Sequence, residues 1–220
     1  GVPIDMSRLP LGETLARYIS VSLTTLSSDR DGIRIDSRSS IGLSITGVAF
    51  TGVVAAIAIP NLMSSRVAAN ETSAQAALKQ LVSTEGVWRQ VDPDGNGVQD
   101  YWVESIEDFY SFQDATGAPH RWIDVNLAKA DFGKLGADAV PKSGYYYSVI
   151  AADAAGTPYS ERKDSAYAFC AWPAEYGTTG VRTYIVNEEG VVYQQDLGAG
   201  KALDAWPDDD PTLEGWVPSD

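Results

Sequence analysis

The residues best suited to chemistry form a short acidic segment with glycines in the middle of the chain. From Asp92 to Asp100, side-chain oxygens stand at the first, third, fifth and ninth positions, and a glycine stands at the sixth. Calcium loops use this spacing to surround a hard cation with oxygen ligands. The predicted ligands are four side chains and one backbone carbonyl: Asp92, Asp94, Asn96, Asp100 and the carbonyl of Val98.

The end of this segment departs from the pattern of an EF-hand. The twelfth position holds Val103 in place of the usual bidentate glutamate, and Glu104 follows one residue later. The sequence therefore predicts a structural Ca²⁺ site with reduced ligation rather than a sensor site. The alternative is an acidic, glycine-rich turn that follows a helix and binds no metal.

The other chemistry-bearing residues do not make up a catalytic set. His120 is the only histidine, and its surroundings in the sequence favour a surface or capping role. Cys170 is the only cysteine, which excludes an intrachain disulfide and favours a small buried apolar side chain. Tyr145 to Tyr147 and Trp172 could line a sugar-binding face, but strand alternation favours packing for them. We therefore expect a protein that is not an enzyme.

The composition is that of a folded, strongly acidic protein. The 220 residues include 30 acidic and 16 basic side chains, for a formal net charge of -14, and 44% are hydrophobic. A surface this negative repels nucleic acids and anionic membrane surfaces, so both are discounted as binding partners.

The most informative segment of the chain is free of charge. No charged residue occurs from Ser39 to Ser65, and the part from Val48 to Ile59 is almost wholly apolar. About 20 such residues suffice for a helix to cross a bilayer. An alanine-rich run with helical spacing follows over 62–88. These patterns predict one long helix over 41–89, apolar in its first half, with a joint at Pro60. The alternative for the apolar half is a buried core helix.

The first 40 residues form an extension with strand character and without the pattern of a secretory signal. Apolar and polar residues alternate in three stretches, and Asp29 to Gly32 is a turn signal between two of them. A strand of this kind could pair with the head of the protein or with a neighbouring subunit. The alternating residues are Ile19, Val21, Leu23, Ile33, Ile35, Ile41, Leu43 and Ile45.

Residues 90–220 are predicted to form a β-rich head with an acidic C-terminal tail. Short aromatic and branched segments over 144–150, 165–172, 181–186 and 190–194 predict antiparallel strands. Asn187 to Gly190 joins the last two as a hairpin. The tail, 205–220, is expected to wrap the surface through its tryptophans. The predicted fold class is α+β, with a long N-terminal helix packed on a mostly antiparallel sheet.

The helical segment resembles a known family. Gly52 to Leu62, followed by Ser65 to Ala74, is similar to the N-terminal helix of type IV pilins and type II secretion pseudopilins, and the resemblance covers about residues 39–75. It implies a pilin-like fold whose apolar half-helix lies in the inner membrane and then packs into the core of a filament. The expected core residues are Val48, Phe50, Val53, Val54, Ile57 and Ile59, with Pro60 as the joint.

The chain departs from the family where pilins are processed. Counting back from Pro60 places Leu43 at the family's glutamate, Arg38 at the glycine of its cleavage site and Ser39 at its methyl-accepting aromatic residue. The leader-peptidase site is thus absent at its expected place, and methylation stays open. The head, from Trp172 to Gly198, is similar to an uncharacterised family of bacterial envelope proteins.

Together these features predict that the chain is a structural subunit of an extracellular, type IV pilus-like or pseudopilus-like filament on a bacterial surface. Its expected partners are copies of itself, the inner membrane before assembly, and a secretion or assembly machinery. The alternative is a monomeric envelope protein, tethered to the membrane by residues 41–62, whose head binds a ligand or a cell-wall polymer. An enzyme is the third hypothesis. Fibres sediment from a sheared supernatant, whereas a tethered monomer partitions with membranes.

Overall fold

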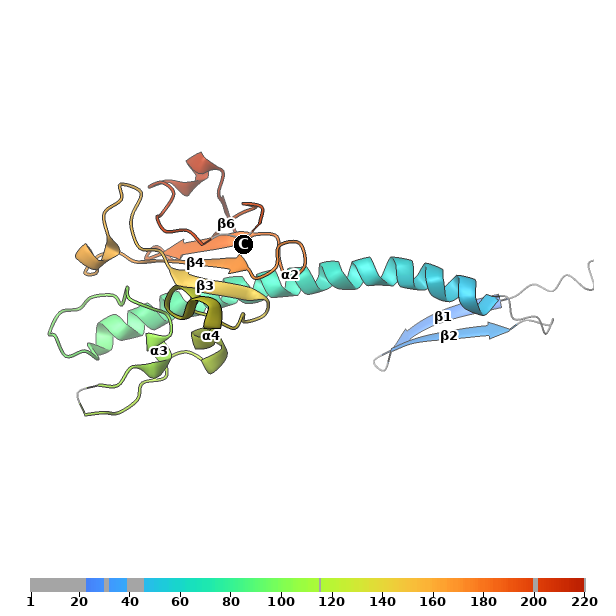
Figure 1. Cartoon of the computed structure of the whole chain (residues 1–220), viewed down its shortest axis with the longest axis horizontal. Coiled ribbons are helices and arrows are strands. Elements are labelled where there is room, and N and C mark those ends of the chain that lie inside the picture. Colours follow the sequence, from blue (N-terminus) through green and yellow to red (C-terminus); the bar gives the residue numbers. More distant parts are fainter. Residues whose placement is uncertain (1–22, 30–31, 39–45, 115, 200–201, 220) are drawn as a thin grey trace, which may run out of the picture. The chain divides into compact units, whose positions relative to one another are not determined.

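The computed structural model describes residues 23–29, 32–38, 46–114, 116–199 and 202–219, with side chains described from Leu62 onward. The chain divides into two compact units, Gly1–Ala58 and Ile59–Asp220. The second unit contains a helix packed on a five-stranded antiparallel sheet, which confirms the predicted α+β class (Figure 1).

In the first unit, strands β1 (Leu23–Asp29) and β2 (Gly32–Arg38) form an antiparallel pair. Their register places Leu26 opposite Ile35 and Asp29 opposite Gly32, so the chain reverses at the predicted turn. Ile33 and Ile35 lie in β2, in agreement with their alternation. The other alternating residues apart from Leu23 lie outside the described residues: Ile19, Val21, Ile41, Leu43 and Ile45.

The long helix α2 runs from Thr46 to Val91, and its backbone is helical on both sides of Pro60. The next residue, Asp92, adopts a left-handed conformation with φ 50 and is followed by Pro93, a combination that stops a helix. The predicted end at 89 is therefore two residues short, and the predicted start at 41 lies outside the described residues. Within the described part of the chain, no helix combines the length and the apolar composition of a membrane span.

The sheet has the order β3-β4-β5-β6-β7, with every neighbouring pair antiparallel. Its strands are β3 (Tyr145–Val149), β4 (Ala168–Pro173), β5 (Thr183–Asn187), β6 (Tyr193–Gln195) and β7 (Val217–Pro218). The first four correspond to the predicted strands, and the Asn187–Gly190 hairpin closes with a 2.9 Å bond from the Gly190 N–H to the Asn187 carbonyl. The tail contributes β7, which was not predicted, because two residues are too few for a pattern.

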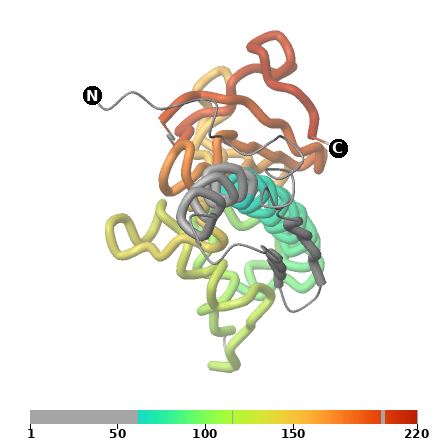
Figure 2. Tube along the Cα trace, turned by 90° about the vertical axis from the view of Figure 1, so that its right-hand side faces the viewer, coloured from blue at the N-terminus to red at the C-terminus, as the bar shows by residue number. Residues whose placement is uncertain are grey.

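Both faces of the sheet are covered. On one face, α2 packs its apolar side against strand residues such as Phe169 and Tyr184. Figure 2 shows the described part of the helix, in turquoise, beside the rest of the head. On the other, Cys170 and Ile185 pack beneath residues of the C-terminal tail. The tail wraps this face through Trp206 and Trp216, which are almost fully buried, as expected from the sequence. Strand β4 is therefore buried over its whole length.

Short helices connect α2 to the sheet. They are α3 (Asp108–Ser111), α4 (Val125–Lys129), α5 (Phe132–Leu135) and the 3-10 turn η2 (Gly136–Asp138). Two further 3-10 turns lie between strands, η3 (Tyr159–Glu161) before β4 and η4 (Pro211–Glu214) before β7. The buried carboxylate of Asp131 ties two of them together, because it accepts bonds from the backbone N–H groups of Ile106, Glu107 and Lys134 at 2.8, 2.9 and 3.2 Å. A charge buried in this way is stable only when it is bonded, so this hub holds the connecting region in place.

Candidate functional site

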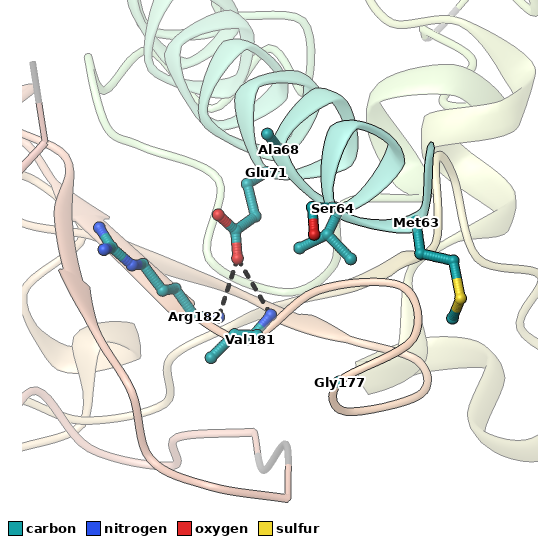
Figure 3. A pocket seen from close by; sticks show the side chains of 8 residues that line it. Met63, Ser64, Ala68, Glu71, Gly177, Val181 and Arg182 are labelled. Atoms are coloured by element: carbon teal, nitrogen blue, oxygen red, sulfur yellow. Dashed lines mark hydrogen bonds between the residues drawn. The ribbon is translucent and has the colours of Figure 1, made fainter. Parts of the chain in front are cut away.

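A groove of about 420 Å³ lies beside α2, next to the part of the helix that packs on the sheet (Figure 3). We call it the junction groove. On α2 it is lined by residues that precede Ala74, the first fully buried residue in the part of the helix whose side chains are described. These are Met63, Ser64, Val67, Ala68 and Glu71. Its other wall is the loop between β4 and β5, which contributes Gly177, Val181 and Arg182.

Two polar side chains of α2 clamp this loop to the helix. The Glu71 carboxylate accepts hydrogen bonds from the backbone N–H groups of Val181 and Arg182 at 3.0 and 3.3 Å (Figure 3). The side-chain amide of Asn70 donates to the carbonyl of Thr179 at 2.8 Å. Because one wall of the groove is helix and the other is a loop held by these bonds, the groove has a defined shape.

Glycine permits the close approach of the loop to the sheet. A Cβ atom on Gly180 would overlap the ring and hydroxyl of Tyr145. That hydroxyl donates to the carbonyl of Arg182 at 3.0 Å, and burial raises the pKa of Tyr145, so it stays a neutral donor. The loop is thus locked from both sides, by α2 and by β3.

Apolar side chains and one charge of each sign line or flank the junction groove. Leu62 and Met63 are 69% and 49% exposed, and Tyr176 of the loop is also exposed. The two charged residues of the lining are Glu71 and Arg182. Because the Glu71 carboxylate is bonded to the backbone of the loop, the rest of the groove is largely apolar.

The predicted assembly-core residues all lie in α2, in the part for which only the backbone is described. Four of them follow the spacing i, i+3, i+4, i+7, which places them along one side of the helix. These four are Phe50, Val53, Val54 and Ile57. The others, Val48, Ile59 and Pro60, lie elsewhere on its circumference.

The predicted calcium loop begins where α2 ends, and the structure brings its polar residues together. Asp92 Oδ2 accepts from the Gly97 N–H at 3.0 Å, and the Asn96 amide donates to Asp94 Oδ2 at 2.8 Å. The same amide lies 3.5 Å from Asp100 Oδ2. Desolvation raises the pKa of Asp94, and contact with Asp92 raises it further, as expected when carboxylates converge.

Two features of the loop bear on its fit to a cation. Asp92 Oδ1 is buried and has no hydrogen-bond partner among the described residues. Asp100 is buried, and its carboxylate pairs with the Lys163 ammonium at 2.7 Å. In the described residues, no group of three or more His, Cys, Asp or Glu side chains has the arrangement of a metal site. The oxygen donors suit Ca²⁺ chemically, but a lysine neutralises one of them.

The aromatic residues, the cysteine and the histidine singled out in the sequence are packed against other side chains. Tyr145 and Tyr147 are buried in the core, and Trp172 packs on Phe132, so packing is confirmed for the aromatic residues. Cys170 is fully buried, and burial raises the pKa of its thiol, as expected of a small apolar core residue. His120 lies 3.1 Å from Asp114 and stacks on Trp122.

The sequence of this chain matches a known family of proteins. The model of a family described as protein of unknown function (DUF2950) matches residues 55–207, well over half of the chain. The chain belongs to the DUF2950 family. No curated protein and no solved structure matches the sequence. The DUF2950 match begins within the apolar half of α2, includes the junction groove and the acidic loop, and ends before β7.

Sequence reasoning missed two glutamates of this DUF2950 chain. Nothing in the sequence near Glu71 indicates its role, because the residues whose N–H groups it binds lie 110 and 111 positions further along the chain. The role of Glu85 is indicated by the sequence, since Glu85 stands on the same side of α2 as Leu78, Leu81 and Trp88. A charged residue within a buried apolar stripe must be bonded, and Glu85 Oε2 accepts from the Trp102 N–H at 2.9 Å.

Proposed function

We propose that this chain is a structural subunit of an extracellular, type IV pilus-like or pseudopilus-like bacterial filament, assembled through the apolar half of α2. The observation that carries the proposal is the contrast between the two halves of this helix. The downstream half buries Leu78 and Leu81 against the sheet of its own head. The upstream half contains no charged residue over its whole circumference.

A helix without a polar face needs apolar surroundings on all sides. Before assembly the inner membrane supplies them for a pilin-like helix, and in the filament other copies of the same helix do. A head-to-tail contact that does not close into a ring extends into a fibre. A secretion or assembly machinery is the expected further partner, because such subunits must leave the membrane during assembly.

The first test places a charge in the apolar half. Val54→Asp is expected to abolish fibres, because a carboxylate without a partner costs several kcal/mol in an apolar bundle. The head should stay folded, since Val54 belongs to the other compact unit. The measurements are negative-stain electron microscopy and the pelletable fraction of a sheared supernatant. Val140→Asp, at a head position that is 56% exposed, is the matched control.

The outcomes separate the filament from the alternatives. Fibres that persist in Val54→Asp would show that the apolar half is not the assembly core. A wild-type chain that pellets with membranes and is released as a monomer by detergent would favour a tethered envelope protein whose head binds a ligand or a cell-wall polymer.

We also propose that the loop Asp92–Asp100 holds a structural Ca²⁺ ion. The supporting observations are that Asp92 and Asp100 both raise the pKa of Asp94, and that Asp92 Oδ1 is buried without a hydrogen-bond partner among the described residues. Ca²⁺ a hundredfold above its Kd should then stabilise the fold by about 2.7 kcal/mol. Thermal unfolding with Ca²⁺, Mg²⁺ or a chelator measures this. Asp94→Asn should remove the gain, and the exposed Asp138→Asn should keep it. Equal unfolding curves in Ca²⁺ and chelator would contradict the site.

A further inference from the structure

We propose that the junction groove is the docking site for the apolar half-helix, residues 46–59, of a second copy of this chain. This inference rests on the proposed function and adds to it the surface that receives the helix. The groove and the exposed side chains beside it provide a largely apolar acceptor on the head unit, and the Glu71 carboxylate in its lining is bonded to the backbone of the loop.

The floor of the groove suits a helix. Ser64 and Ala68 stand four residues apart on α2, so their small side chains lie one above the other on the same side. Gly177 faces them from the loop, and the space where its Cβ would be is open. Small residues in this arrangement let the backbone of another helix approach closely. The donor segment has the same spacing, with Gly52 and Ala56 four residues apart.

The distribution of charge identifies the occupant. Residues 66–220 hold 11 of the 16 basic and 25 of the 30 acidic side chains, which is the whole net charge of -14. Two such heads repel each other, so the surface of a second head is a poor occupant. Residues 46–65 carry no charge and can enter the groove without that repulsion.

Other segments of the chain fit less well. The acidic tail could be attracted to Arg182, but its own tryptophans, Trp206 and Trp216, anchor it on the far face of the sheet. The β1–β2 hairpin has charged side chains along β2, such as Arg34 and Asp36. The apolar half-helix is the segment that matches the groove in both polarity and side-chain size.

The contact would be heterologous, because the donor and acceptor surfaces are different parts of the chain. Each copy would present one of each, so contacts could continue in one direction without closing. Glu71 acts in this arrangement as a positioning residue, since its bonds to Val181 and Arg182 hold one wall of the groove against the other.

The first experiment fills the groove. Ala68→Trp places a large side chain in the hollow, whereas Ala76→Trp places it at an exposed position of the same helix outside the groove. Ala68→Trp is expected to lower the pelletable fibre fraction about tenfold or more, the effect of losing about 1.4 kcal/mol per contact. Ala76→Trp should assemble like the wild type, and both heads should unfold at the wild-type temperature. Normal fibres from Ala68→Trp would overturn the proposal.

The second experiment tests proximity within fibres. Chains with Ala68→Cys are co-assembled with tagged chains that have one added cysteine at one of residues 53–56, which cover about one helical turn. Mild oxidation should give a tagged heterodimer for at least one of the four positions. Ala76→Cys in place of Ala68→Cys is the control, and the native Cys170 is fully buried.

The results distinguish this inference from the function on which it rests. If fibres form and no position cross-links to Ala68→Cys more than to Ala76→Cys, the groove is not the acceptor, while the filament proposal stands. If the wild-type chain forms no fibres, both proposals fail together.

Discussion

Glu85 is a carboxylic acid placed among apolar residues. It is fully buried on α2; its Oε2 accepts from the Trp102 N–H, and its Oε1 has no partner among the described residues. Desolvation raises the pKa of Glu85 well above its usual range, and the nearby Asp100 carboxylate raises it further. The buried carboxyl therefore holds its proton to a higher pH in the folded chain than in the unfolded one.

This ionisation should make stability depend on pH in a definite direction. The pKa of a glutamate in the unfolded chain is about 4.3, so above this pH the folded chain binds the extra proton and the contribution of Glu85 to stability falls as pH rises. The loss is about 1.4 kcal/mol for each pH unit up to the native pKa. Glu85→Gln removes it.

The measurement is chemical denaturation of the wild type and of Glu85→Gln at a series of pH values above about 4.3, the pKa of a glutamate in the unfolded chain. The stability of the variant relative to the wild type should increase with pH. Glu104→Gln, at an exposed position, is the matched control. A difference that does not change with pH would mean that Glu85 is ionised normally in the folded chain.

At the scale of elements, one glycine in the loop between β4 and β5 and one glycine in α2 have opposite roles. Gly180 lies against Tyr145, where a Cβ atom has no room. Gly86 lies on the exposed side of α2, where nothing comes within 4 Å of an added Cβ. The first glycine is required by packing, and the second only weakens a helix.

Alanine at these two positions should therefore change stability in opposite directions. Gly180→Ala is expected to lower the free energy of unfolding by about 1–3 kcal/mol, because the loop and Tyr145 must move apart. Gly86→Ala should raise it by about 0.5–1 kcal/mol. Urea denaturation measures both. If Gly180→Ala were neutral, the close contact between the loop and β3 would be wrong.

At the scale of the whole molecule, the net charge and the apolar surface lie in different parts of the chain. Residues 66–220 carry the charge of -14, and residues 46–65 carry none. In the proposed filament, contacts through the apolar half-helix would bring the acidic heads together. Their mutual repulsion would then oppose the burial of apolar surface and limit the growth of fibres.

Salt should therefore favour assembly. The Debye length falls from about 10 Å at 0.1 M to about 3 Å at 1 M, which screens the heads but leaves apolar contacts intact. The concentration of chain needed to form fibres should fall as NaCl rises, as measured by sedimentation with Ca²⁺ held constant. Fibres that dissolve in salt would indicate an ionic contact, with Arg182 as the first residue to substitute.

The sequence by itself determined the local elements of this protein. The i, i+3, i+4 spacing predicted the downstream half of α2, alternation predicted β3 to β6, and Asn187–Gly190 predicted the hairpin, because each pattern depends only on near neighbours. The contacts among Asp92, Asp94 and Asn96 could also be predicted, because these residues are close neighbours in the sequence of one loop.

The tertiary structure decided what distant residues do to one another. The Asn70 and Glu71 clamp joins residues 109 and 110 positions apart, and the junction groove exists only because that loop lies beside the helix. Lys163 reaches Asp100, and the tail adds β7 to the sheet. No local pattern encodes such contacts, because their energy depends on which surfaces the folded core brings within reach.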